Sequence, residues 1–133
     1  MDYLKPEMTA AEANAMSMLA LAHVGDGVYE LLTRTMLARK GHTGVSDLHH
    51  RTVEIVNAPA QAKASARILP VLTEEELAVF KRGRNAKVMS VPQNAEIGEY
   101  HAATGLEALF GWLYLRGKTE RVNELYALCV EEK

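Results

Sequence analysis

Residues 21–31 run Leu21-Ala22-His23-Val24-Gly25-Asp26-Gly27-Val28-Tyr29-Glu30-Leu31. Small and aliphatic residues dominate this stretch and continue at helical spacing on both sides of it. Thr9 followed by Glu12 has the form of a capping box, which predicts that one long helix or two abutting helices begin there. Asp26 therefore lies in an apolar helical surround. A carboxylate in that position is either kept for a function or reaches solvent at a kink that Gly25 and Gly27 allow.

Helical periodicity extends over nearly all of the 133 residues, and no convincing run of alternating β-branched residues interrupts it. Gly41 and Gly44 bracket the loop that ends the first helical stretch. Capping and breaking residues then predict helices from Ser46 and Asp47, from Pro59 to Arg67, from Thr73 to Gly83, from Asn94 to about Arg116, and from Thr119 to about Glu131. Residues 83–93 are predicted to form an irregular connection. We therefore expect an all-α fold in a single domain over residues 1–133.

The charges are unevenly distributed along the chain. Residues 34–87 hold ten of the 15 Lys and Arg and five of the 17 Asp and Glu, so this part carries a net charge of +5 and the remainder −7. The basic part either forms a face that binds a polyanion or simply belongs to surfaces that differ in charge. No apolar run is long enough to span a membrane and no secretory signal is present, which predicts a cytoplasmic protein without a membrane partner.

A second isolated acid lies near the C-terminus. Glu107 is the single charge in residues 104–115, an otherwise apolar helical segment. If this helix crosses the one that carries Asp26, the two carboxylates can converge on one cation, because hard divalent ions need clustered oxygen ligands. His23 lies three residues before Asp26 and is either a hydrogen-bonding support for this site or an ordinary interface histidine.

A third feature is the basic segment Phe80-Lys81-Arg82-Gly83-Arg84-Asn85-Ala86-Lys87. We expect it on a glycine-containing loop, where Lys81, Arg82, Arg84 and Lys87 can contact a phosphate backbone and Asn85 adds a hydrogen-bonding group. The alternative is a solvated cationic turn.

Together these segments resemble the ribonuclease III family. Val24 to Val28 is similar to the signature helix of that family, Lys81 to Lys87 to its Gly-Arg-containing loop, and Glu107-Ala108-Leu109-Phe110-Gly111 to its last catalytic helix. All three occur in family order, and the similarity extends from about Ala20 to Leu115. The resemblance is greatest to the Mini-ribonuclease III branch, which lacks the C-terminal double-stranded-RNA-binding domain.

The resemblance implies a ribonuclease III endonuclease-domain fold and Mg²⁺-dependent cleavage of double-stranded RNA, with Asp26 and Glu107 as catalytic and metal-binding residues. It further implies a homodimer with the Gly25–Gly27 helix near the twofold axis, staggered cuts, and maturation of the large-subunit (23S) ribosomal RNA precursor, with assistance from a ribosomal protein left open. Two acids of full-length ribonuclease III are replaced here by Ala22 and Thr104. Thr104 is therefore expected beside the metal rather than bound to it.

Two other classes of protein fit parts of the sequence. The replaced acids at Ala22 and Thr104 also suit a non-catalytic double-stranded-RNA-binding scaffold of the same fold. The acidic balance outside residues 34–87 suits a small helical module that binds other proteins.

Overall fold

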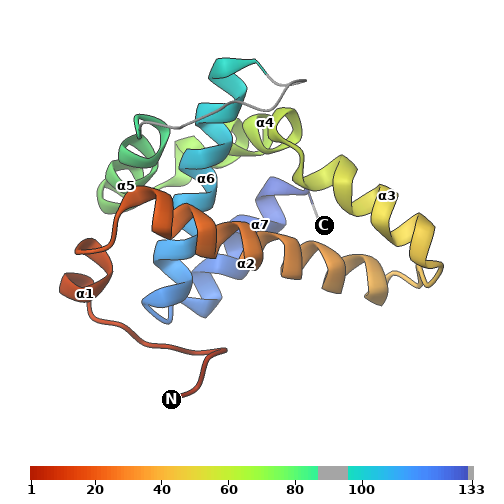
Figure 1. The fold of residues 1–133 in the computed structure, drawn as a ribbon, viewed down its shortest axis with the longest axis horizontal. Coiled ribbons are helices and arrows are strands. Elements are labelled where there is room, and N and C mark those ends of the chain that lie inside the picture. Colours follow the sequence, from red (N-terminus) through yellow and green to blue (C-terminus); the bar gives the residue numbers. More distant parts are fainter. Residues whose placement is uncertain (87–95, 132–133) are drawn as a thin grey trace.

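The structure is a computed structural model, and it describes residues 1–86 and 96–131. Within these residues it has α-helices, one short 3₁₀ helix and no strand, so the predicted all-α fold is confirmed (Figure 1). The elements are α1 (Ala10–Asn14), α2 (Met18–Arg39), α3 (Val45–Val56), α4 (Ala58–Ile68), the 3₁₀ helix η1 (Leu69–Val71), α5 (Glu74–Arg84), α6 (Ile97–Leu115) and α7 (Thr119–Cys129). None of the described helices combines the length and apolar character needed to cross a bilayer.

Helix α6 is the centre of the fold. Its residues from Ala103 to Leu113 are buried with the single exception of Glu107, because α2, α4, α5 and α7 all pack against it. An ordinary surface helix buries one stripe and leaves the other face to solvent. The near-continuous apolar sequence of α6 is thus explained by burial on several sides. Glu107 is the charged residue that this burial has to accommodate.

Helices α2 and α6 cross with their backbones in contact. A Cβ atom built on Gly25 would lie 1.6 Å from the carbonyl oxygen of Glu107, and one built on Gly111 would lie 2.0 Å from the carbonyl oxygen of Leu21. Only glycine fits at both positions, since real Cβ atoms do not approach this closely. Figure 1 shows α2 crossing α6. Because Gly25 meets the backbone of Glu107 there, Asp26, the next residue on α2, also lies near Glu107.

Several predicted helix starts agree with the structure. Thr9 and Glu12 form a complete capping box, and the chain then makes two abutting helices, with Ser17 as the cap of α2. Asn57 caps α4 and is followed by Ala58 and Pro59 in the first turn. Thr73 and Glu76 form the capping box of α5, in front of three acidic residues that favour the positive end of the helix dipole.

Other predicted boundaries are wrong. Helix α3 begins at Val45 with Gly44 as its N-cap residue, so Ser46 and Asp47 do not cap it. Asp47 lies inside the first turn, where it binds Arg51 one turn later, at 2.9 Å. Lys118, rather than Thr119, occupies the N-cap position of α7. The cap predicted at Asn94 lies outside the described residues, and α6 begins at Ile97 after Glu96.

Helix α5 ends at Arg84, close to its predicted end near Gly83. The irregular connection predicted to begin at residue 83 is wrong there, because Gly83 is a buried helical residue. A Cβ atom on Gly83 would lie 2.7 Å from Cβ of Ala108 and 3.1 Å from Cα of Gly105. The glycine therefore permits close packing of α5 on α6, and this tertiary contact outweighs its low intrinsic helix propensity.

Candidate active site

Asp26 lies on α2, directly after the glycine at the helix crossing, and its side chain is exposed. Glu107 lies on α6 at the other side of the same crossing and is partly buried. The side chains interact: burial, and then the hydrogen bond and like charge of Asp26, raise the pKa of Glu107 from 4.5 to about 8. Two acids that are 81 positions apart in the sequence are thus neighbours in the fold.

A third side chain, which the sequence did not indicate, belongs to this site. Gln61 lies on α4 with 2% of its surface exposed. Its amide acts on Glu107 in the sense opposite to Asp26, because it lowers the pKa of that carboxyl. Among the described residues, Nε2 of Gln61 has no partner at hydrogen-bonding geometry. The available signal was a long polar residue on the same face of α4 as Ala64 and Ile68.

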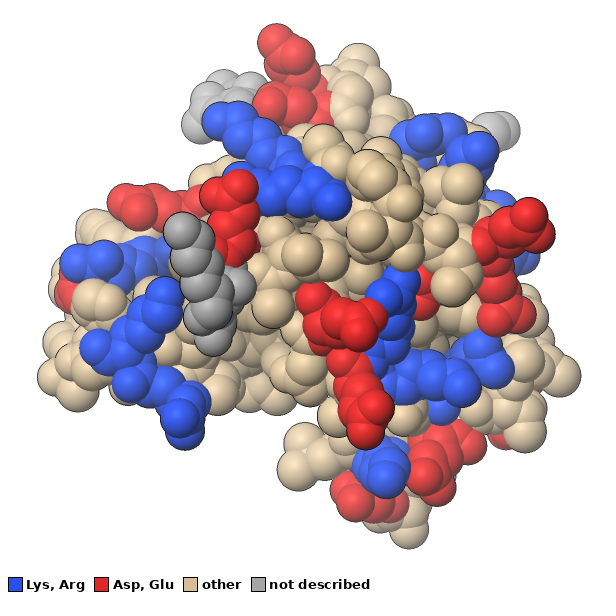
Figure 2. Space-filling model, turned by 180° about the vertical axis from the view of Figure 1, so that it is seen from behind, with Lys and Arg blue, Asp and Glu red and all other residues tan. Residues whose placement is uncertain are grey.

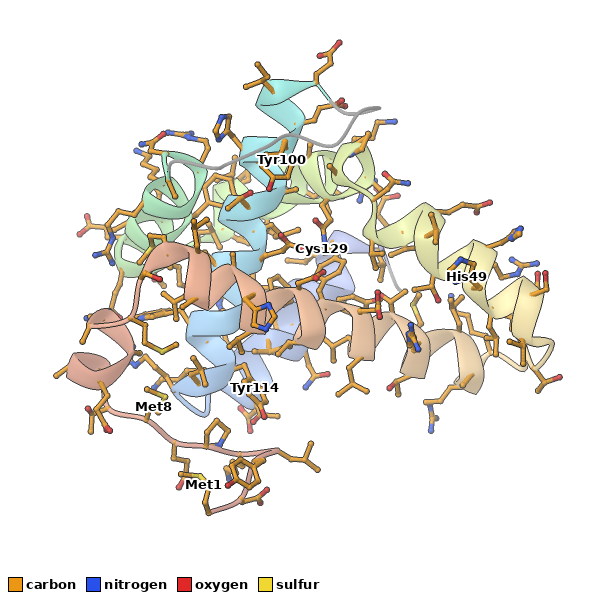
Figure 3. All side chains as sticks on the ribbon, in the orientation of Figure 1. Met1, Met8, His49, Tyr100, Tyr114 and Cys129 are labelled. Carbon is orange, nitrogen blue, oxygen red and sulfur yellow. The ribbon has the colours of Figure 1, made fainter. Side chains whose placement is uncertain are left out.

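Ala22 and Thr104, which stand where full-length ribonuclease III has acids, are both buried. Ala22 lies one turn before Asp26 on α2 and contributes to the core. Thr104 lies on α6 near Glu107, but its hydroxyl donates to the carbonyl oxygen of Tyr100 at 3.0 Å. Figure 3 labels Tyr100, which lies in the first turn of α6, and Tyr114, which lies near the end of the helix. Thr104 therefore satisfies its polar atom within its own helix.

His23 is exposed on α2, three residues before Asp26. In the part of the chain that the structure describes, no group of three or more His, Cys, Asp and Glu side chains is arranged to hold a metal ion. The acidic set at the crossing consists of Asp26 and Glu107. Any ion held there would receive its remaining ligands from other groups.

These residues fit a divalent cation. Two carboxylates are hard oxygen donors, and a 2+ ion would be neutralised by their two charges. The raised pKa of Glu107 shows that the pair is poorly compensated by the protein itself. The unpartnered amide of Gln61 is a further polar group at the same place. A cation would offset both the cost of burying the Glu107 charge and its repulsion from Asp26.

The basic segment lies at the C-terminal end of α5, which corrects its predicted loop conformation. Lys81 and Arg82 are exposed, whereas Arg84 is partly buried with its guanidinium 5.9 Å from the centre of the Phe80 ring. Asn85 is the C-cap residue of α5 and accepts a hydrogen bond from Nε of Arg84 at 3.5 Å. Cations are favourable there because the end of a helix carries partial negative charge. Lys87 lies outside the described residues.

The basic part of the sequence does not form one face. Its cations are spread over α2, α3, α4 and α5. The end of α5 and the α2–α3 turn lie on opposite sides of the molecule in Figure 1. Figure 2 shows basic and acidic side chains mixed over the back of the molecule. The cations at the end of α5 lie near the part of α6 that precedes Glu107, because Gly83 packs against α6 beside Thr104.

Comparisons with known proteins identify the family. A model of the ribonuclease III domain matches residues 19–118. The chain is 43% identical over 118 residues to Mini-ribonuclease 3 of Symbiobacterium thermophilum, which covers 89% of this chain and 91% of that one. It is 45% identical over 121 residues to Mini-ribonuclease 3 of Brevibacillus brevis, covering 91% and 90% of the two chains. A crystal structure of a Fusobacterium nucleatum protein matches with a TM-score of 0.81 at 30% identity and covers 90% of this chain and 96% of that one. The chain therefore belongs to the ribonuclease III domain family, among the Mini-ribonuclease 3 proteins.

Membership of this family confirms the resemblance seen in the sequence. It makes the protein an endoribonuclease that acts on RNA, in a family that generally depends on divalent metal ions. The two other classes, a non-catalytic scaffold and a protein-binding module, are accordingly disfavoured.

Proposed function

We propose that the protein cleaves double-stranded RNA in an Mg²⁺-dependent reaction at the site formed by Asp26 and Glu107. The observation that carries the proposal is the meeting of these two acids at the α2–α6 crossing, where the pKa of Glu107 is raised to about 8. Perturbed acids that share one place are typical of catalytic and metal-binding sites.

The two acids have different tasks in this proposal. Asp26 is exposed and can meet both the ion and a phosphate that approaches from solvent, whereas Glu107 holds the ion from the partly buried side. When bound, the ion supplies a water that is nucleophilic at neutral pH and relief of the charge that develops on phosphate. Glu107 must lose its proton to act as a ligand, so ion binding and its deprotonation are coupled.

Substrate binding is assigned to the end of α5. Lys81 and Arg82 are exposed there, and we propose that they contact the phosphate backbone together with Arg84, Asn85 and Lys87. Recognition would rest on the A-form shape of the duplex, because side chains cannot read its narrow major groove. His23, exposed three residues before Asp26, is proposed to support that acid, and Thr104 to line the site without binding the ion.

We further propose a homodimer in which each subunit cuts one strand. An antiparallel duplex has its own twofold symmetry, which an isologous dimer matches. Gly25 is already used against α6 within the subunit, so Gly27 is the glycine left open on α2. It borders an apolar groove with Val28 and the exposed Leu31, and such a groove supports a contact between subunits.

From the family resemblance, we propose that the protein acts in the cytoplasm, as a single catalytic domain, in the maturation of the large-subunit ribosomal RNA precursor. Whether a ribosomal protein assists it can be tested with the same substrate. The short exposed cationic surface at α5 predicts weak RNA binding that depends steeply on salt.

The test is cleavage of an end-labelled RNA duplex. We expect cutting with Mg²⁺, none in EDTA, and recovery when Mg²⁺ is restored. Single-stranded RNA and a DNA duplex of the same sequence are the controls. Cleavage that persists in EDTA, or that prefers single strands, would contradict the proposal.

A further inference from the structure

Gln61 is a buried polar residue whose amide nitrogen is not used by its own helix. It lies on the face of α4 that packs against α6, together with Ala64, Ser65 and Ile68. Burying an amide without a hydrogen bond costs free energy, so buried unpaired amides are rare in folded proteins. The position therefore calls for a reason other than packing.

Other buried polar side chains on α3 and α4 form hydrogen bonds within their own helices. Ser65, one turn later and 3% exposed, donates from its hydroxyl to the carbonyl oxygen of Ala62 at 2.7 Å. Thr52 on α3 donates to Leu48 in the same way, also at 2.7 Å. Both satisfy their hydroxyl hydrogens within their own helices, whereas Nε2 of Gln61 has no partner at hydrogen-bonding geometry among the described residues. Gln61 lies on a helix that packs against α6, and its side chain lowers the pKa of Glu107.

The site lacks two of the acids that full-length ribonuclease III carries. The two positions that carry further acids in full-length ribonuclease III are Ala22, which lies in the core, and Thr104, whose hydroxyl donates to Tyr100. Neither contributes a carboxylate to the site. Gln61 is a further polar side chain, supplied by a third helix, α4.

We propose that Gln61 is a positioning residue of this nuclease. When an ion is bound, its Nε2 donates to the Glu107 carboxylate and keeps it turned toward Asp26 and the ion. The inference rests on the proposed function, since it requires that Glu107 bind a divalent ion. In this proposal, the uncharged amide of Gln61 orients Glu107, a task that a third carboxylate does not perform here. Hydrogen bonds of this kind orient metal ligands and are expected to affect ion affinity.

The first test is Gln61→Met, which keeps the length and apolar volume of the side chain but removes the amide. We expect the Mg²⁺ concentration at half-maximal cleavage to rise roughly 10–100-fold. The melting temperature in EDTA should stay the same or rise, because a buried unpaired amide is lost. Mg²⁺ binding without RNA, followed as the increase in melting temperature with ion concentration, should weaken in parallel.

Ser65→Ala is the matched control, since it removes a buried polar group from the same face of α4. It should lower the melting temperature in EDTA and leave the Mg²⁺ requirement unchanged. The same pattern in Gln61→Met, a loss of stability without a change in Mg²⁺ requirement, would overturn the proposal.

A second measurement needs no variant. In the wild-type protein, the side-chain amide resonances of Gln61 should shift on titration with Mg²⁺. Those of Asn14, which accepts from the Trp112 indole at 2.9 Å, should stay in place. If Mg²⁺ stabilises the protein and the Gln61 amide does not move, the role of Gln61 is wrong while the metal site stands. If Mg²⁺ neither stabilises the protein nor supports cleavage, the proposed function itself fails.

Discussion

Two acids of this protein are drawn into the folded interior, and their surroundings differ. Glu76 on α5 is 5% exposed and is held by Arg121 of α7, which donates to Oε1 at 2.8 Å and to Oε2 at 2.9 Å. Burial disfavours the charge of Glu76, but the hydrogen bonds from Arg121 and Thr73 outweigh it, and its pKa lies below its ordinary value. Glu107 is not paired with a Lys or Arg of residues 1–86 or 96–131, and burial together with the facing Asp26 raises its pKa to about 8.

The difference separates a structural acid from a candidate functional one. The chain supplies a permanent cation for Glu76, and this pair joins α5 to α7. At the α2–α6 crossing none of the described Lys and Arg side chains pairs with Glu107, so its negative charge is available to a bound cation. An acid that the protein leaves uncompensated is the stronger candidate for metal binding.

The largest expected effect is on cleavage. Asp26→Asn and Glu107→Gln should each reduce the cleavage rate by roughly 10³-fold or more, because each removes a charge that holds the ion. Glu76→Gln should lower stability and leave the rate per folded molecule near that of the wild type. The rates are measured on a labelled RNA duplex at saturating Mg²⁺. Near-full activity in either site variant would remove that residue from the site.

The helix crossing can be broken directly. Gly25→Ala places a methyl group where the Glu107 carbonyl oxygen lies, so we expect a loss of about 3 kcal/mol or more in the free energy of unfolding. Gly27→Ala is the matched control on the same helix, since a Cβ atom there meets nothing within 4 Å. It should be neutral or stabilise the subunit by up to about 1 kcal/mol. Urea denaturation gives both values, and equal stability of the two variants would contradict the observed crossing.

The pH dependence of stability should have opposite signs at the two acids. Glu107 has a folded pKa of about 8 and an ordinary value of 4.5, so its folded form retains the proton that the unfolded chain releases. In EDTA, stability should therefore fall as pH rises through this window, at up to about 1.4 kcal/mol per pH unit from this group. Glu107→Gln should remove that fall, which melting curves between pH 4.5 and pH 9 would show.

Glu76 serves as the comparison within the same experiment. Its folded pKa is lowered, so its stabilisation is present above its unfolded pKa of about 4.5 and is lost as pH falls through the lower folded value. Glu76→Gln should therefore be destabilised at neutral pH and approach the wild type in acid. If both variants changed stability in the same direction at pH 8, the contrast between the two sites would be lost.

The smallest expected effect concerns RNA binding. Replacing Arg82 and Arg84 with Ala should weaken duplex binding several-fold and reduce the salt slope by about one unit for each phosphate that is no longer neutralised. Replacing Arg34 and Arg39, on the opposite side of the molecule, is the control and should change the slope less. Dissociation constants at several salt concentrations, in Ca²⁺ or EDTA to prevent cleavage, give the slopes. Identical slopes in the wild type and the α5 variant would assign those cations to a solvated helix end.

The sequence predicts a helix boundary correctly where residues within one turn of each other form the cap. The capping boxes at Thr9 and Thr73 were predictable because their partners lie three residues away. The loop predicted at Gly83 was wrong because the glycine serves a contact with α6, more than 20 positions later in the chain. Gln61 was missed for a similar reason, since nothing in its own segment indicates that Glu107 faces it.

By itself, the sequence determined that the chain is helical and that Asp26 and Glu107 are isolated acids in apolar helices. Their periodicity and surroundings are local properties, carried by residues within a turn or two. Only the tertiary structure decided that these acids meet, because that depends on Gly25 and Gly111 letting two helix backbones touch. It also decided that Gln61 joins them and that the α5 cations are helical, since packing on α6 controls both positions.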